Sequence, residues 1–227
     1  AMEPQHRVFL EECWKAIEDA GYNPEDLQRA KVGVFVGAGA GDYLRLLQKT
    51  EEDKAGAAFM GSSQAILAAR ISYLLNLTGP AIAVDTACSS SLVAVDRACK
   101  SILSGESTMA LAGGVSLLTT PIGHIWTSQV GMPSKEGRCK TFDNSADGIV
   151  SSEGVGVLLL KRLEEARRDG DRIYGVIKGS GINQDGRTNG ITAPSARSQS
   201  ELQQEIYEKY SIDPSTVSYV EAHGTGT

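Results

Sequence analysis

Cys88 is the residue of this sequence best placed to do chemistry. It follows the apolar run of residues 81–84 and precedes three serines that open an expected helix. A thiol at the start of a helix lies close to free backbone N–H groups and to the positive end of the helix dipole, which favour the thiolate. Its small neighbours Ala87 and Ser89 allow the sharp turn of a nucleophile elbow. Most cysteines of α/β domains are buried structural residues, but this position between strand and helix predicts a nucleophile.

His223 is the second candidate catalytic residue. It ends the apolar run of residues 217–222 and is followed by alternating glycines and threonines. The glycines allow a ligand to approach the backbone, and Thr225 and Thr227 offer hydroxyls. Cysteine and histidine of a nucleophilic pair need to be neighbours in space only, so their separation of 135 positions is no obstacle. A thiol protease would also fit this pair.

The remaining candidates are interpreted structurally. His6 lies on the polar start of a helix, where we expect it to be solvated, and His124 is expected to pack in a loop, although it could line a channel. The glycines of residues 37–41 lack the lysine and hydroxyl residues of a phosphate-binding loop, so no nucleotide site is predicted. Three carboxylates resemble turn and capping residues more than metal ligands. They are Asp143, Asp147 and Glu153.

Composition excludes several classes of protein. The 227 residues include 22 Lys and Arg against 28 Asp and Glu, a net charge of −6 without a basic cluster, which argues against a nucleic-acid partner. Four cysteines at irregular spacing predict no zinc site and favour a reducing, cytoplasmic environment. The longest uncharged stretch, residues 107–134, contains glycines and prolines that make it a poor membrane span. A hydrophobic share of 41% indicates a folded protein.

Hydrophobic periodicity predicts alternating strands and helices. A first helix is expected in the opening segment, with apolar residues at helical spacing from Leu10 to Ile17 and Gly21 closing it. Further helices are expected over residues 64–76, 89–103, 163–168 and 198–210, and strands over residues 32–36, 81–84, 109–118, 155–160, 173–178 and 217–222. Several strands are apolar throughout, as parallel strands covered on both faces tend to be. The pattern predicts an α/β fold. Because a strand runs into a reactive side chain twice, at Cys88 and at His223, two similarly built halves could face one site.

Five stretches carry a family resemblance. Residues 85–92 (DTACSSSL) and 221–227 (EAHGTGT) resemble the nucleophile and first histidine motifs of the β-ketoacyl synthases, specifically ketosynthase domains of modular type I polyketide synthases. Further agreement comes from MEPQHR, GRCKTFD and GINQDGRTNG, which occupy residues 2–7, 137–143 and 181–190. The resemblance covers nearly the whole chain, in order.

The resemblance implies a thiolase-like αβαβα sandwich, usually a homodimer. Because such domains extend beyond both ends of this sequence, we expect residues 1–227 to be a fragment truncated at both ends. Residues 1–153 would form the first half and residues 154–227 the start of the second. His6 stands where the family more often has glutamine, and Ser151 and Ser152 replace a step that usually contains glycine.

The resemblance also implies a reaction. Cys88 would accept an acyl chain from an acyl carrier protein and condense it with a malonyl-type unit by decarboxylative Claisen chemistry. His223 would serve decarboxylation and stabilise the developing oxyanion, while Thr225 and Thr227 would hold the phosphopantetheine arm that carries the substrates. No cofactor is expected to be bound intrinsically, and no metal.

The family's second catalytic histidine and its lysine lie outside this sequence. The fragment alone is therefore expected to be inactive. An alternative is a ketosynthase-like domain that transfers acyl chains or supports a dimer without elongating them.

Overall fold

The computed structural model describes residues 2–47 and 55–227. The chain divides into two compact units, one of Ala1–Asp171 with His223–Thr227 and one of Arg172–Ala222. The sequence predicts a division near residue 153, and that boundary remains a prediction. In the part of the chain that the structure describes, no helix is both long and apolar enough to span a bilayer.

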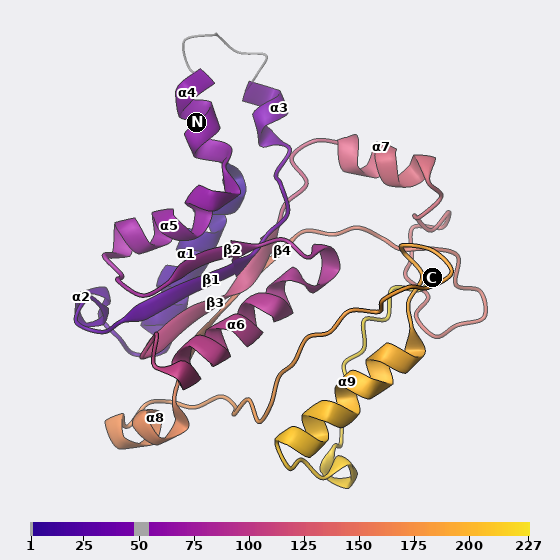
Figure 1. Ribbon diagram of the computed structural model, residues 1–227. Helices are drawn as coiled ribbons and strands as arrows, with labels where there is room; N and C mark the ends of the chain where they lie inside the picture. Colours follow the sequence, from indigo (N-terminus) through magenta and orange to yellow (C-terminus); the bar gives the residue numbers. More distant parts are fainter. Residues whose placement is uncertain (1, 48–54) are drawn as a thin grey trace. The chain divides into compact units, whose positions relative to one another are not determined.

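A four-stranded sheet forms the centre of the first unit, as the predicted α/β class requires (Figure 1). Its strands are β1 (Val32–Gly37), β2 (Ala81–Val84), β3 (Met109–Ser116) and β4 (Gly154–Lys161), in the order β2-β1-β3-β4. β1 is parallel to β2 and β3, with Val34 opposite both Ala81 and Leu111. β4 runs antiparallel to β3, so the expectation of parallel strands holds for three of the four.

Alternating side chains of β1 face two different helical layers. Val32, Val34 and Val36 pack in one core cluster with residues of α1 (Pro4–Asp19) and α5 (Gln64–Leu75). Phe35 points the other way, into a second cluster with Ala94 and Ala98 of α6 (Ser90–Ser104). This is the period of two expected of a strand covered on both faces. Figure 1 shows α6 on one side of the sheet and α1 and α5 on the other.

The other helices of this unit are short and lie in its connections. They are α2 (Pro24–Leu27), α3 (Tyr43–Leu47), α4 (Ala55–Ser62), α7 (Ile122–Gln129) and α8 (Leu163–Asp169). Of these only α8 was predicted from sequence. The solvated position predicted for His6 is also wrong, because its side chain is 2% exposed. The first turn of α1 is buried against other parts of the protein, and the polar sequence of this turn does not predict that burial.

The second unit is built around α9 (Ala196–Lys209). Gly179 and Gly181 run close to this helix, and a Cβ at Gly181 would lie 2.4 Å from the Cδ1 atom of Ile206. The strands predicted over residues 173–178 and 217–222 are absent from the structure, which assigns no strand to either segment. Both segments are apolar, but a strand also needs a neighbour to accept and donate its backbone hydrogen bonds.

Candidate active site

Cys88 lies in the turn between β2 and α6, and its side chain is exposed. A single 3-10 turn over Ala87–Ser89 connects the two elements. Ala87 has a φ of 55°, in the left-handed region that residues other than glycine rarely adopt. Such a backbone conformation costs about 1–3 kcal/mol and persists only where the surroundings enforce it. The structure thus has the sharp strand-to-helix turn that the sequence predicts.

Side chains of the turn itself enforce this conformation. Asp85 Oδ1 accepts the N–H of Ala87 at 3.0 Å. Ser90 Oγ accepts the N–H of Thr86 at 2.8 Å and donates to the carbonyl of Ala87 at 2.7 Å. These bonds close the loop around Ala87 without involving the sulfur of Cys88.

Two glycines bring α6 close to the sheet directly after the thiol. A Cβ at Gly37 in β1 would lie 2.3 Å from the carbonyl carbon of Ser90, and one at Gly114 in β3 would lie 2.7 Å from the Cβ of Ser91. Real Cβ atoms do not approach so closely, so only glycine fits at either position. The first turn of α6 therefore packs directly against the ends of β1 and β3. This turn carries the free N–H groups and the positive end of the helix dipole.

His223 belongs to the same compact unit as Cys88, and its side chain is exposed. The residues after it are held by the loop of residues 139–148. Gly226 accepts the N–H of Gly148 at 3.1 Å, and Thr141 donates its hydroxyl to the carbonyl of Gly224. Gly226 is also tightly packed, because a Cβ there would lie 3.0 Å from the backbone nitrogen of Lys140.

The predicted binding residues Thr225 and Thr227 lie next to each other in this segment. Their hydroxyl oxygens are 3.0 Å apart, with Thr225 half-buried and Thr227 exposed. Among the described residues no hydrogen bond joins Cys88 to His223. The pairing of these two side chains, and the binding role of the threonines, remain predictions.

The candidate carboxylates accept hydrogen bonds from backbone and hydroxyl groups, locally at Asp143 and across longer stretches of chain at Asp147 and Glu153. Asp147 accepts the hydroxyl of Ser134 at 2.7 Å, and this bond holds the pKa of Asp147 below its usual value. Asp143 accepts both the N–H and the hydroxyl of Ser145, which likewise lowers its pKa. Glu153 accepts the N–H of Leu118 at 2.8 Å. Within residues 2–47 and 55–227, no three His, Cys, Asp or Glu side chains gather as metal ligands do.

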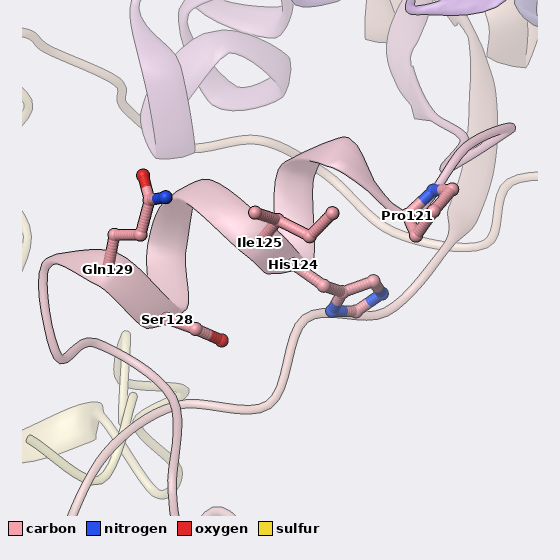
Figure 2. A pocket seen from close by; sticks show the side chains of 5 residues that line it. All are labelled: Pro121, His124, Ile125, Ser128 and Gln129. Carbon is pink, nitrogen blue, oxygen red and sulfur yellow. The ribbon is translucent and has the colours of Figure 1, made fainter.

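Sequence reasoning missed helix α7 and the hollow beside it. Figure 2 shows this hollow and the side chains that line it, which are Pro121, His124, Ile125, Ser128 and Gln129. His124 lies on a helix, not in the predicted loop, and it does line a hollow. Apolar residues at Ile122, Ile125 and Trp126, after a proline, were the signal that could have revealed the helix.

Two family models together match almost the whole chain. The model of the β-ketoacyl synthase N-terminal domain matches residues 1–166, and the model of the β-ketoacyl synthase C-terminal domain matches residues 174–227. The chain belongs to the β-ketoacyl synthase family. The strand-to-helix turn with an exposed Cys88 is thus found in a β-ketoacyl synthase with a thiolase-like fold.

Known proteins with a region similar to this chain are polyketide synthases. The chain is 55% identical to polyketide synthase PksL of Bacillus subtilis over 226 residues, which is all of this chain and 5% of that protein. It is 46% identical to the pikromycin polyketide synthase component PikAII of Streptomyces venezuelae, again over all of this chain and over 6% of that protein. The chain therefore spans only a small part of these relatives.

Solved ketosynthases have the same fold over this whole chain. The ketosynthase from module 6 of the bacillaene synthase of Bacillus subtilis superimposes with a TM-score of 0.88 at 54% identity. The oxazolomycin ketosynthase domain OzmH KS7 of Streptomyces albus superimposes with a TM-score of 0.94 at 40% identity. This chain covers 39% and 40% of those two chains, so both solved chains are more than twice as long as this one.

Proposed function

We propose that this β-ketoacyl synthase extends an acyl chain by decarboxylative Claisen condensation with a malonyl-type unit, in polyketide biosynthesis. The observation that carries the proposal is the exposed Cys88 thiol at the turn from β2 to α6, in a chain matched by both family models. The named polyketide synthases and solved ketosynthases among its relatives support the same reaction.

The first step transfers the acyl chain to Cys88. The sulfur attacks the thioester carbonyl of a chain held on the phosphopantetheine arm of an acyl carrier protein. A bond forms between the carbonyl carbon and Cys88, the bond to the carrier sulfur breaks, and the proton of Cys88 passes to the carrier thiol. The backbone N–H of Cys88 stabilises the tetrahedral oxyanion, and Thr225 and Thr227 hold the arm by their hydroxyls.

The second step forms the carbon–carbon bond. A malonyl-type unit on a carrier loses CO2, which leaves an electron pair on an enolate whose oxygen is stabilised by His223. The enolate carbon attacks the carbonyl of acyl-Cys88, the carbon–sulfur bond breaks, and the thiolate of Cys88 is regenerated. The product is a β-ketoacyl chain, two backbone carbons longer, on the carrier protein.

The proposal includes the setting of the enzyme. Acyl carrier proteins are its partners, and the phosphopantetheine arm arrives with the substrate, so the chain needs no cofactor of its own. We further propose that the full-length synthase is a cytoplasmic homodimer without a nucleic-acid partner.

The test uses the full-length protein and two variants. Cys88→Ala should abolish acylation by a carrier-bound thioester, measured by intact-protein mass spectrometry. His223→Ala should still become acylated but lose CO2 release and β-ketoacyl product. Cys139→Ala is the matched control, because Cys139 is also an exposed free cysteine. Acylation of the Cys88→Ala protein would refute the nucleophile. A wild-type protein that is acylated but never yields β-ketoacyl product would support the non-elongating alternative.

A further inference from the structure

Four successive backbone N–H groups after β3 donate to side chains from distant parts of the chain. They belong to residues 117–120, which we call the anchored segment, and their acceptors are Gln5, Asp42 and Glu153, which we call the anchor. The distances are 3.2 Å from Leu117 to Gln5 Oε1, 2.8 Å from Leu118 to Glu153 Oε1, 3.2 Å from Thr119 to Asp42 Oδ1 and 2.9 Å from Thr120 to Asp42 Oδ2. All four N–H groups thus donate to side chains outside the segment. These hydrogen bonds hold the segment in place although it forms no helix or strand.

Asp42 accepts two of these four N–H groups and makes further contacts with the same segment. Besides the two N–H groups, its carboxylate accepts the hydroxyls of Thr119 and Thr120, the latter at 2.5 Å. Burial would raise the pKa of Asp42, but the hydrogen bonds from the two threonines outweigh burial and lower it. Hydrogen bonds to an ionised acceptor are roughly twice as strong as neutral ones. At neutral pH Asp42 therefore holds both threonines as an anion.

The same region of the chain also fixes α7. Thr120 Oγ1 accepts the N–H of Ile122, the first residue of α7, at 3.3 Å. Arg45 in α3, three residues after Asp42, places its guanidinium carbon 4.9 Å from the ring centroid of Trp126 in α7. Both Asp42 and Arg45 belong to the stretch that follows β1, so this stretch contacts α7 directly through Arg45 and indirectly through Asp42 and Thr120.

Gln5 connects the ends of two parallel strands. Its side chain is nearly buried, and its Nε2 donates to the carbonyl of Gly39 at 3.2 Å while its Oε1 accepts from Leu117. Ala38 in the same loop donates its N–H to Val84, the last residue of β2, at 3.0 Å. Because β1, β2 and β3 are parallel, their carboxyl ends meet at one edge of the sheet. The anchored segment and the turn of Cys88 share that edge.

We propose that Asp42 is a positioning residue for acyl transfer to Cys88, acting with Gln5 and Glu153 through the anchored segment and α7. The inference rests on the proposed function of Cys88. A carrier-bound thioester must fit the surroundings of the sulfur before attack, whereas a small alkylating reagent needs only an accessible thiol. Release of the anchored segment therefore slows acyl transfer and leaves the reactivity of the thiol unchanged.

The experiment compares two rates at Cys88 in the full-length protein carrying Asp42→Asn. The NH2 group of the new amide faces N–H and hydroxyl groups that are themselves donors. Part of the hydrogen bonding to Thr119 and Thr120 is therefore lost. We expect kcat/KM for acylation by a carrier-bound acyl thioester to fall about ten- to a hundredfold. The rate of alkylation by iodoacetamide should stay at the wild-type value. Asp213→Asn is the matched control, because Asp213 caps Ser215 at 2.9 Å and makes no hydrogen bond to the anchored segment.

Thr120→Val and the double variant Asp42→Asn/Thr120→Val complete a double-mutant cycle, in which kcat/KM for acylation is compared. If the two residues act through one contact, the double variant loses less than the product of the two single losses. Unchanged acylation in Asp42→Asn, or an equal fall of acylation and alkylation, overturns the inference. Should Asp42→Asn fail to fold, Thr120→Val alone must slow acylation relative to alkylation, and an unchanged ratio overturns the inference. Wild-type protein that is not acylated at Cys88 overturns the proposed function instead.

Discussion

Among single residues, His6 shows how strongly tertiary surroundings change a side chain whose sequence position looks ordinary. It is 2% exposed, and its Nδ1 atom has no hydrogen-bond partner among the described residues. Burial, with a smaller effect from the charge of Arg70, lowers the pKa of His6 to about 4. Glu3 lies buried in the same turn, and burial raises its pKa. Both side chains are therefore biased toward their neutral forms.

The lowered pKa of His6 predicts a loss of stability in mild acid. As the pH falls from about 6.5 to about 4, the unfolded chain takes up the proton first, so the free energy of unfolding decreases by about 1.4 kcal/mol per pH unit. His6→Gln should remove this part of the pH dependence. Urea midpoints of the full-length protein and its variant, measured from pH 7 to pH 4, test it. Glu3 is present in both proteins and cancels in the difference, so parallel pH curves would contradict the prediction.

Sequence reasoning predicts Cys88 as the nucleophile, and that role stays a prediction. It does not reveal the anchor as a set, although it names Glu153 as a capping carboxylate. Cys88 is recognisable because the apolar strand, the small neighbours and the helix start are all local to it. Gln5, Asp42 and Glu153 are scattered along the chain, and only the folded sheet brings their oxygens to one segment. His223 was likewise found from its neighbours, but its geometry relative to Cys88 stays a prediction.

At the scale of elements, predictions succeeded where a repeat of apolar residues spans several turns or a whole strand. α1, α5, α6 and α9 and all four strands of the sheet were predicted, with small differences at their ends. Of the short helices, α8 was predicted, whereas α2, α3, α4 and α7 were missed because one or two turns give little periodicity. The antiparallel direction of β4 was missed because a strand's own residues do not encode its partner. Residues 173–178 and 217–222 have the pattern of strands but no strand assignment in the structure.

The junction between the sheet and α6 gives a prediction at this scale. Gly37→Ala should push the first turn of α6 away from β1, because the new Cβ would overlap the backbone of Ser90. We expect a loss of about 1–3 kcal/mol in stability, typical of overpacking, together with slower acylation of Cys88. Gly156→Ala is the control, since a Cβ there meets no atom within 4 Å. Thermal unfolding and acylation rates measure both effects, and equal behaviour of the two variants would rule out a tight junction.

For the molecule as a whole, large hydrophobic side chains are exposed in both units, and in the second unit they lie on segments without strand partners. Tyr174 is 71% exposed, and Tyr219 and Val220 are 75% and 74% exposed. Solved ketosynthases that match this chain are more than twice as long. Apolar residues in extended segments without strand partners are prone to pair with other molecules.

We therefore expect the 227-residue chain, produced alone, to self-associate. Analytical ultracentrifugation should show species larger than a monomer, and thermal unfolding should be broad. The complete ketosynthase domain is the comparison, and it should sediment as one defined species. A soluble monomer of the shorter chain with a sharp cooperative melt would show that these exposed segments are tolerated.

The sheet order β2-β1-β3-β4 also has a consequence in time. Every strand that supports the turn of Cys88 lies before residue 162, whereas His223 follows 135 positions after the cysteine. A ribosome adding about 5–20 residues per second needs roughly 7–27 s to cover that interval. The nascent chain thus contains Cys88 and all four strands of the sheet before His223 is synthesised, so the core beneath Cys88 can form first.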